Sequence, residues 1–338
     1  MPIANTALRL FQSGLEVDAT PGTAVPATSK MAVTDIVFTP TDVFHRPKLA
    51  KGLITRNPGN ETVIARGTAF SIPETPVVYD QMHHYLAMAV KGDVAAAGAP
   101  SVYTWTFPRD ILADPDINTR TLERRLSDGT NFIDNEWAYA FLSLLRFIYE
   151  ADQPLRFSAE GFARRMQSST LTAGQVFPTI EIPPTALAKV WIDSTWATLG
   201  TTLIEAQVLR AELAFMTGYA PKMSLDGRTD LDFTTILLNA ANVGMDLKLR
   251  LLIKADSGQF ATEKAAAVAG TLRAIRIKVT GTASRALTLD GLYKYNVPEI
   301  GTIGSEDGQD IAELDLVDAT DATNLFSAEV VNATNAVA

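Results

Sequence analysis

Residues 155–164 read Leu-Arg-Phe-Ser-Ala-Glu-Gly-Phe-Ala-Arg, and residues 247–254 read Leu-Lys-Leu-Arg-Leu-Leu-Ile-Lys. In both stretches apolar side chains alternate with polar ones, so an extended chain would have one apolar and one hydrated face. Alternation of this kind is typical of half-buried antiparallel strands. The same pattern recurs at 209–215, 275–279, 311–317 and 326–332.

Short polar connections separate several of these stretches. Glu150–Pro154 is expected to turn the strand 137–149 into the strand 155–166. Gly281–Arg285 is expected to turn 272–280 into 286–295. Neighbouring strands should therefore pair as hairpins.

Helical patterns are sparse. The best runs from Pro76 to Lys91, with Thr75 as the N-cap and an apolar stripe along one side. A weaker pattern spans Leu231–Ala241. Because strands flank each expected helix, the order is compatible with two related strand–helix–strand halves, although no residue-level repeat supports duplication. We predict a mainly β fold, an antiparallel β-sandwich or barrel with one or two packed helices.

Composition narrows the class of protein. With 338 residues and 47% hydrophobic side chains, the chain can bury one large all-β core or two ordinary ones. The absence of cysteine excludes disulfides and thiolate metal sites. The residues from Met1 to Leu15 lack a signal-peptide pattern, and the most apolar run, 137–149, is too short to span a bilayer. We expect a soluble protein that does not insert into membranes.

The charge of the chain is unevenly distributed. The net charge is −9, and residues 295–338 contain nine acidic side chains and no Lys or Arg. Proteins that grip nucleic acid show the opposite bias, because they neutralise phosphates with clustered basic residues. This acidic region could be a solvated tail, a calcium-rich surface or a face that repels polyanions.

Motifs that would carry chemistry are missing. His83 and His84 are adjacent on an expected helix, about 100° apart around its axis, so they cannot jointly hold one metal ion. The stretch from Asp114 imitates the start of a calcium loop but has Arg125 where a bidentate Glu is needed. The basic pairs 124–125 and 164–165 are more typical of strand ends and ion pairs between subunits than of a phosphate-binding track.

No pair of carboxylates stands out for acid–base catalysis, and no nucleophile elbow, phosphate loop or zinc motif occurs. Trp137, Trp191 and Trp196 lie in apolar runs, which favours core packing or interface anchoring. We expect no enzymatic activity, no cofactor and no metal. A carbohydrate-active enzyme with scattered carboxylates remains a weak alternative.

Residues 14–28 read Gly-Leu-Glu-Val-Asp-Ala-Thr-Pro-Gly-Thr-Ala-Val-Pro-Ala-Thr. Pro21 and Pro26 remove backbone donors, and Gly22 between them favours a turn. The small side chains leave little to bury. The segment can take a fixed position only along another surface, its own or that of a neighbour.

The run Thr-Pro-Gly-Thr-Ala-Val-Pro-Ala-Thr at 20–28, with the acidic residue Asp18 shortly before it, resembles the N-terminal arm of tail tube proteins from long, non-contractile-tailed bacteriophages. Other stretches are similar to the strands, long loop, helix and C-terminus of that family, in the same order: 38–67, 75–91, 124–162 and 306–335. The resemblance implies an extended assembly arm over residues 1–30 and a tail tube β-domain over 31–338. Segments 95–135 and 189–203 would be insertions or stacking loops, and 299–338 acidic C-terminal strands.

The resemblance further implies homo-oligomeric rings, most simply hexameric, that stack into a tube. DNA would pass through the channel without specific binding, and other tail proteins would contact the tube ends. The protein would be assembled in the host cytoplasm and reside in the virion tail. The arm would reach a neighbouring subunit, and its deletion should impair stacking while leaving the β-domain folded. Its expected contact residues are Glu16, Asp18, Thr20, Pro21, Gly22, Thr23, Val25 and Pro26.

A channel lined with carboxylates would repel DNA phosphates, so that the genome slides without stopping. Glu313, Asp315 and Glu329 are the candidates for this face. The alternative is that they solvate an outer surface. At the level of the whole chain, the alternative to a tube protein is a β-sandwich module that decorates the virion or binds a receptor.

Overall fold

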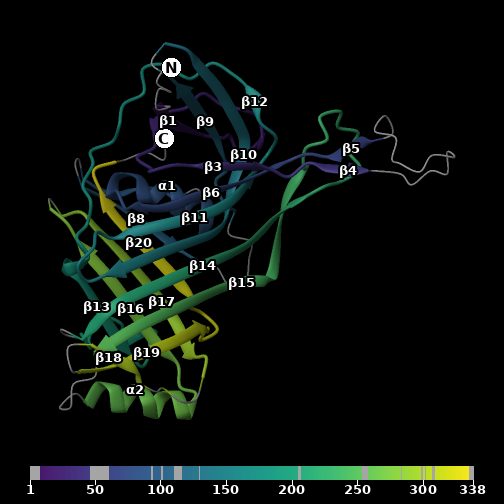
Figure 1. Cartoon of the computed structure of the whole chain (residues 1–338). Coiled ribbons are helices and arrows are strands. Elements are labelled where there is room, and N and C mark those ends of the chain that lie inside the picture. Colours follow the sequence, from purple (N-terminus) through teal and green to yellow (C-terminus); the bar gives the residue numbers. More distant parts are fainter. Residues whose placement is uncertain are drawn as a thin grey trace, which may run out of the picture.

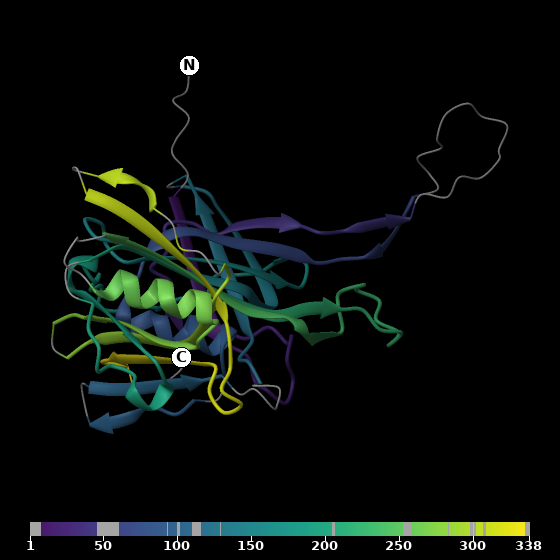
Figure 2. The same ribbon diagram turned by 90° about the horizontal axis from the view of Figure 1, so that it is seen from below.

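The computed structural model describes residues 8–45, 61–92, 94–99, 102–109, 116–128, 130–204, 207–252, 258–282, 284–297, 300, 302–306 and 309–334. Residues 1–7 of the predicted arm, Asp114 of the calcium-like stretch and the end of the acidic region, 335–338, lie outside this set. The described chain is mainly antiparallel β-structure with two α-helices, which confirms the predicted fold class (Figures 1 and 2).

The N-terminal elements are β1 (Leu8–Leu15), β2 (Ser29–Lys30), β3 (Val37–Pro40), β4 (Val43–His45), β5 (Thr62–Ala65), β6 (Thr68–Pro76), α1 (Tyr79–Ala89), β7 (Ala97–Ala99), β8 (Val102–Pro108), β9 (Arg120–Ser127), β10 (Phe132–Glu150), β11 (Arg156–Ala163) and β12 (Gln167–Ser168). The remaining elements are the 3₁₀ turns Thr185–Leu187 and Trp196–Thr198, the strands β13 (Ala188–Asp193), β14 (Val208–Lys222) and β15 (Thr235–Leu252), the helix α2 (Gly258–Ala269), and the strands β16 (Arg273–Thr280), β17 (Ala286–Tyr295), β18 (Thr302–Glu306), β19 (Gln309–Asp318) and β20 (Phe326–Asn332).

The described strand ladders other than β4–β5 form one connected antiparallel system that curls around the core. One branch runs β7–β8–β20–β17–β16–β13. A second runs β3–β6–β11–β10–β14–β15–β19 and meets the first at β17. The long strand β10 also pairs with β9 and β12, and β9 pairs with β1. Both predicted hairpins, β10–β11 and β16–β17, are present.

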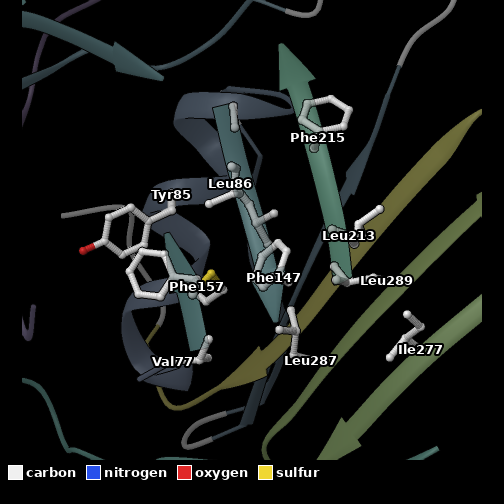
Figure 3. Close-up of a cluster of buried hydrophobic side chains, with 14 of the residues drawn as sticks. Val77, Tyr85, Leu86, Phe147, Phe157, Leu213, Phe215, Ile277, Leu287 and Leu289 are labelled. Atoms are coloured by element: carbon white, nitrogen blue, oxygen red, sulfur yellow. The ribbon is translucent and has the colours of Figure 1, made fainter. Parts of the chain in front are cut away.

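The alternating stretches occupy these ladders as their patterns predict. Leu247, Leu249 and Leu251 of β15 are buried, whereas Lys248 is exposed and Arg250 half-buried. Each fully buried large apolar side chain contributes about 1.5–3 kcal/mol through removal from water. The apolar faces of the two branches meet in a single large core (Figure 3).

Helix α1 lies inside this core, and all of its residues are buried. It packs against β10, β20 and β8. The ring of Tyr85 lies 4.7 Å from that of Phe157, and Leu86 is 0% exposed (Figure 3). The predicted apolar stripe is therefore only part of a helix that is covered on every side.

The predicted start of this helix is wrong by three residues. Thr75 and Pro76 belong to β6, where they pair with Phe157 and Arg156 of β11. The Thr75 hydroxyl donates to the carbonyl of Pro73 rather than capping the helix. The proline ends a strand here because its ladder partner holds it in an extended conformation.

The predicted helix at Leu231–Ala241 is also wrong, because Thr235 begins β15. The ladder continues past the body of the protein, where Lys222 of β14 pairs with Thr235 and Tyr219 pairs with Leu238. Pairing with β14 overrides a helical spacing of apolar residues that is only eleven residues long.

The second helix is α2, which lies at the opposite end of the body from β1 and β9 (Figure 1). Its alanine-rich sequence has high helix propensity. It is half-exposed, with Glu263, Ala266 and Ala267 buried. Glu263 accepts hydrogen bonds from Arg273 Nε (2.8 Å) and from the Tyr295 hydroxyl, which anchors the helix on β16 and β17.

Two segments expected to be insertions or stacking loops contain ladder strands. Residues 95–135 include β8 and β9, and Trp105, Phe107 and Leu122 in them are almost fully buried. Residues 189–203 include most of β13, which pairs with β16 along its length. These segments therefore build the body of the protein.

Candidate assembly surfaces

The predicted arm folds back on its own subunit. The Thr28 N–H donates to the carbonyl of Ser13 (2.9 Å), and the Met31 N–H donates to that of Phe11 (2.9 Å). Between these contacts and the end of β1, the segment turns at Thr20 and Thr23 and makes no ladder of its own. The sequence left open whether this segment lies on its own subunit or on a neighbouring one. In the single chain it lies on its own subunit. Contact with a neighbouring subunit stays a prediction.

Glu16 fixes the first part of this segment. Its side chain is 3% exposed, and its carboxylate accepts hydrogen bonds from the Gly22 N–H (2.7 Å), the Thr119 hydroxyl (2.9 Å), the Thr121 hydroxyl (3.0 Å) and the Tyr139 N–H (2.6 Å). Four donors on one carboxylate replace the ladder bonds that this sequence cannot form.

Tyr139 has φ of 59° and lies at an irregularity of β10 between Trp137 and Ala140. For a residue with a bulky side chain this left-handed conformation is unfavourable by roughly 1–3 kcal/mol. The hydrogen bond from its N–H to Glu16 compensates. The arm and the bulge therefore depend on each other.

Glu123 of β9 fixes the second part of the segment. It is 3% exposed and accepts from the Ala27 N–H (3.1 Å), the Thr172 N–H (2.8 Å), the Thr172 hydroxyl (2.6 Å) and the Gln12 amide (3.2 Å). The sequence draws attention to Glu123 only through its basic neighbours. Nothing in the pattern marks it as a buried acceptor.

The other predicted arm residues divide by exposure. Val25 is half-buried and its N–H donates to the Thr121 hydroxyl (3.0 Å). The exposed members of the set are Asp18, Thr20, Pro21, Thr23 and Pro26. Because the segment supplies buried groups to its own subunit, we now expect its deletion to destabilise the β-domain.

Arg164 joins the arm to the distal part of the β14–β15 hairpin, which runs from Tyr219 to Leu238. Its guanidinium donates to the carbonyl of Gly22 (2.7 Å) and to that of Phe233 (3.3 Å). The same group lies over the ring of Tyr139, 4.8 Å from the centroid. Burial lowers the pKa of Arg164, and the nearby charge of Arg228 lowers it further.

Two hairpins project from one side of the body (Figures 1 and 2). The first is β4–β5, a two-stranded sheet separate from the main ladder system. The second is the distal part of β14–β15, from Tyr219 to Leu238. Both views place the two projections next to each other.

Exposed apolar side chains gather on these projections. Val43 and Ile64 of the first are 49% and 53% exposed, and Leu225 of the second is fully exposed. Phe44, Met223 and Leu237 add to the set. A two-stranded hairpin is marginally stable alone in water, so a partner that covers it would stabilise it.

The loop that closes the β14–β15 hairpin contacts the chain next to β5 of the first projection. The Arg66 N–H donates to the carbonyl of Leu231 (2.8 Å), and Arg66 forms a parallel bridge with Asp232. Asp232 is buried and accepts from the Arg165 N–H (3.1 Å). Burial raises the pKa of its carboxyl group.

The predicted channel carboxylates point away from the core but face cations. Glu313 lies 3.6 Å from the guanidinium of Arg250 on β15. Asp315 is opposite Lys248 in the ladder and accepts from the Asn296 amide (3.0 Å). The strand is therefore acidic, but its face of the sheet carries both signs of charge.

Glu329 of β20 is half-buried and lies opposite Thr288 of β17. Arg276, which forms a bidentate pair with Asp290 at 2.7 Å, lies near enough for Glu329 to help raise the pKa of that guanidinium. This carboxylate also has a cation beside it.

The two histidines of α1, His83 and His84, are buried and contact other side chains of the protein. His83 stacks on Trp105 at 4.8 Å, and the amide of Asn332 lies 3.1 Å from its Nδ1. His84 Nδ1 lies 2.8 Å from Arg120 Nη2, and burial holds the pKa of His84 well below its usual value. Within the described ranges, no group of three or more His, Asp or Glu side chains is placed to hold a metal ion.

Neither α1 nor α2, the helices of the described part of the chain, has the length and apolar character needed to cross a bilayer. The sequence matches no protein family and has no significant match among curated proteins.

Proposed function

We propose that this chain is a structural virion protein that forms homo-oligomeric rings, most simply hexameric, which stack into a phage tail tube. In this proposal DNA passes through the channel on its way to the host, and the chain catalyses no reaction and needs no cofactor. Its partners are further copies of itself and other tail proteins at the tube ends. It is assembled in the host cytoplasm and resides in the virion tail.

The observation that carries the proposal is the pair of projecting hairpins with exposed apolar side chains. Both strands of a two-stranded sheet are edge strands, and an exposed strand edge can pair with another chain. A projection on one side of a subunit that fits a different surface of the next copy makes a head-to-tail contact. Such contacts close into rings or continue as filaments.

The mixed-charge outer face of β15 and β19 is compatible with two placements. If it lines the channel, the cations beside Glu313 and Asp315 lessen the repulsion of DNA that a purely acidic wall would provide. If it lies outside, the pairs simply solvate the tube. A density map of assembled tubes, in which these carboxylates face either the lumen or the exterior, decides between them.

Negative-stain electron microscopy of the concentrated purified protein tests the proposal. Rings, or tubes about as wide as a phage tail, are expected, with matching fast-sedimenting species in velocity sedimentation. A monodisperse monomer at high concentration would contradict the proposal. That outcome would favour a virion decoration or receptor-binding module.

A further inference from the structure

A pocket of about 270 Å³ opens at the base of the β4–β5 hairpin, where β3, β9 and β10 meet. Its lining includes Phe38, Asp42, Arg66, Arg124, Trp137 and Arg165. Three arginines and one aspartate therefore line a small, half-open pocket. None of the contacts described for the arm or the distal hairpin fills it.

Two aromatic rings lie close to one of these cations, Arg124. Phe38 stacks on Trp137, with centroids 3.7 Å apart and ring planes within 5°. The Arg124 guanidinium carbon lies 5.0 Å from the Trp137 centroid and 5.4 Å from that of Phe38. The guanidinium therefore lies beside the stacked pair, within cation–π distance of both rings.

Four buried N–H donors of this lining have no acceptor among the described residues. They are Nε of Arg66, Arg124 and Arg165, and the indole Nε1 of Trp137. Trp137 is 1% exposed, so bulk water does not satisfy its indole. Buried donors are nearly always hydrogen-bonded, so an oxygen-bearing group in the pocket could satisfy those that face it.

The electrostatics favour an anion. Burial lowers the pKa of Arg124 and the charge of Arg9 lowers it further, whereas the charge of Asp35 raises it. An incoming negative charge would favour the charged guanidinium and offset the two lowering effects. Arg165 has Asp232 at 3.6 Å, too far for a hydrogen bond. A carboxylate or phosphate oxygen could accept from several of the four donors.

The rim favours a protein over a polynucleotide. Met166, which lines the pocket, is 52% exposed, and Val43 on the adjoining hairpin is 49% exposed. Apolar side chains around a cationic pocket suit a side-chain carboxylate with apolar neighbours. This chain supplies such carboxylates itself, because residues 295–338 contain nine acidic side chains and no basic one.

We propose that this pocket receives a carboxylate side chain from the acidic C-terminal region of a second copy of the chain. The inference rests on the proposed self-assembly and specifies the contact by which one copy recognises the next. The bound carboxylate would accept from Arg124 and Trp137. The contact joins two different surfaces, as a head-to-tail interface requires.

A zero-length cross-link tests the contact directly. Arg124→Lys places an amine in the pocket, and a carbodiimide joins an amine to a carboxylate that touches it. The variant is assembled from equal amounts of ¹⁴N- and ¹⁵N-labelled protein, and the cross-linked peptides are identified by mass spectrometry. We expect peptides of mixed label that join position 124 to a carboxylate within 295–338.

Arg125→Lys is the matched control. Arg125 is the next residue of β9 and pairs with Asp134 of its own chain at 2.6 Å. Its cross-link should join positions 125 and 134 in peptides of a single label. If position 124 also gives only single-label cross-links, or none, while tubes form normally, the pocket has no such partner and holds water.

Arg124→Gln provides an independent measurement. We expect the concentration needed for assembly to rise at least about tenfold, which corresponds to roughly 1.4 kcal/mol, with an unchanged melting temperature. Wild-type protein that stays monomeric would overturn the proposed assembly and this contact with it. Wild-type tubes with an unaffected Arg124→Gln variant would overturn the contact alone. Short duplex DNA that binds the wild type but not Arg124→Gln would assign the pocket to phosphate instead.

Discussion

Glu16 and Glu123 show how single carboxylates give a fixed path to a segment that proline and glycine keep out of any ladder. Each accepts four hydrogen bonds while nearly excluded from water. A buried carboxylate of this kind stabilises the fold while it and its donors are all in place. If one member is removed, the groups that it contacted stay buried without a hydrogen bond, which is unfavourable. These residues act as hubs for the N-terminal segment.

Glu16→Gln should therefore destabilise the protein by about 1.5–3 kcal/mol. The amide introduces N–H donors where four donors already converge, and it removes the charge that strengthens those bonds. Chemical denaturation followed by circular dichroism measures the change. Thr20→Ala, at an exposed position of the same segment, should leave the unfolding free energy within about 0.5 kcal/mol. Equal stability of both variants would contradict the role given to Glu16.

The ion pair between Arg125 and Asp134 gives a pH-dependent prediction. The bidentate guanidinium, with further help from the Leu171 N–H, lowers the pKa of Asp134 below its usual value. A lowered folded-state pKa adds stability that is fully present above the unfolded pKa of about 3.9 and is lost as the pH falls through the folded pKa.

Asp134→Asn should thus lower the unfolding free energy by about 1.5–3 kcal/mol at pH 7. The difference from the wild type should shrink once the pH falls below about 4. Urea titrations at several pH values provide the measurement. A difference that stays constant down to pH 2 would rule out the ionised pair as its source.

For single residues, the sequence predicts which side chains are buried better than it predicts which groups they contact. The alternation of 247–251 assigns each side chain to the correct face. The left-handed backbone conformation of Tyr139 cannot be predicted from the sequence. It interrupts an otherwise regular apolar run, and it depends on a hydrogen bond to Glu16 from a distant part of the chain. Arg124 and Arg165 were noticeable as basic pairs, but only folding brings them to one pocket.

At the scale of elements, α1 and α2 differ in what stabilises them. Helix α1 is covered on all sides by strands, so tertiary packing holds it in place. Helix α2 has a half-exposed, alanine-rich sequence and depends more on intrinsic propensity and on the Glu263 anchor. The first is recognisable from its apolar stripe. The second is rich in alanine and has no marked apolar stripe, so the spacing of apolar residues does not predict it.

Truncation of one apolar side chain in each helix measures this difference. Leu86→Ala should destabilise the protein by about 2–5 kcal/mol, because it leaves a cavity in the core. Val268→Ala, at a position 67% exposed on α2, should change stability by less than about 0.5 kcal/mol. Comparable losses from the two substitutions in thermal denaturation would mean that α2 is covered in solution.

For the whole molecule, the fold class followed from period-two alternation, whereas the projecting surfaces did not. The distal part of β15 carries apolar residues at helical spacing, and only pairing with β14 makes it a strand. Exposure of Ile64 and Leu225 cannot be deduced from their sequence, since an apolar residue is ordinarily assigned to the core.

Ile64→Asp tests the role of the projections. A charge on this exposed position should raise the concentration needed for assembly by at least about tenfold, because it would have to be desolvated in the interface. The melting temperature of the monomer should stay unchanged. Ile64→Val keeps the position apolar and should assemble normally by velocity sedimentation. Normal tubes from Ile64→Asp would exclude this hairpin from the interface.

The hydrogen bond from the Arg66 N–H to the Leu231 carbonyl links the two projecting hairpins, so their movements are coupled. A subunit that captures one hairpin also restrains the other, so the entropic penalty of ordering both falls mainly on the first encounter. Later contacts then form on a partner already held in position. Growth would accordingly show a lag before the first complete ring and rapid addition afterwards, with the junction at Arg66 setting how sharply the two phases separate.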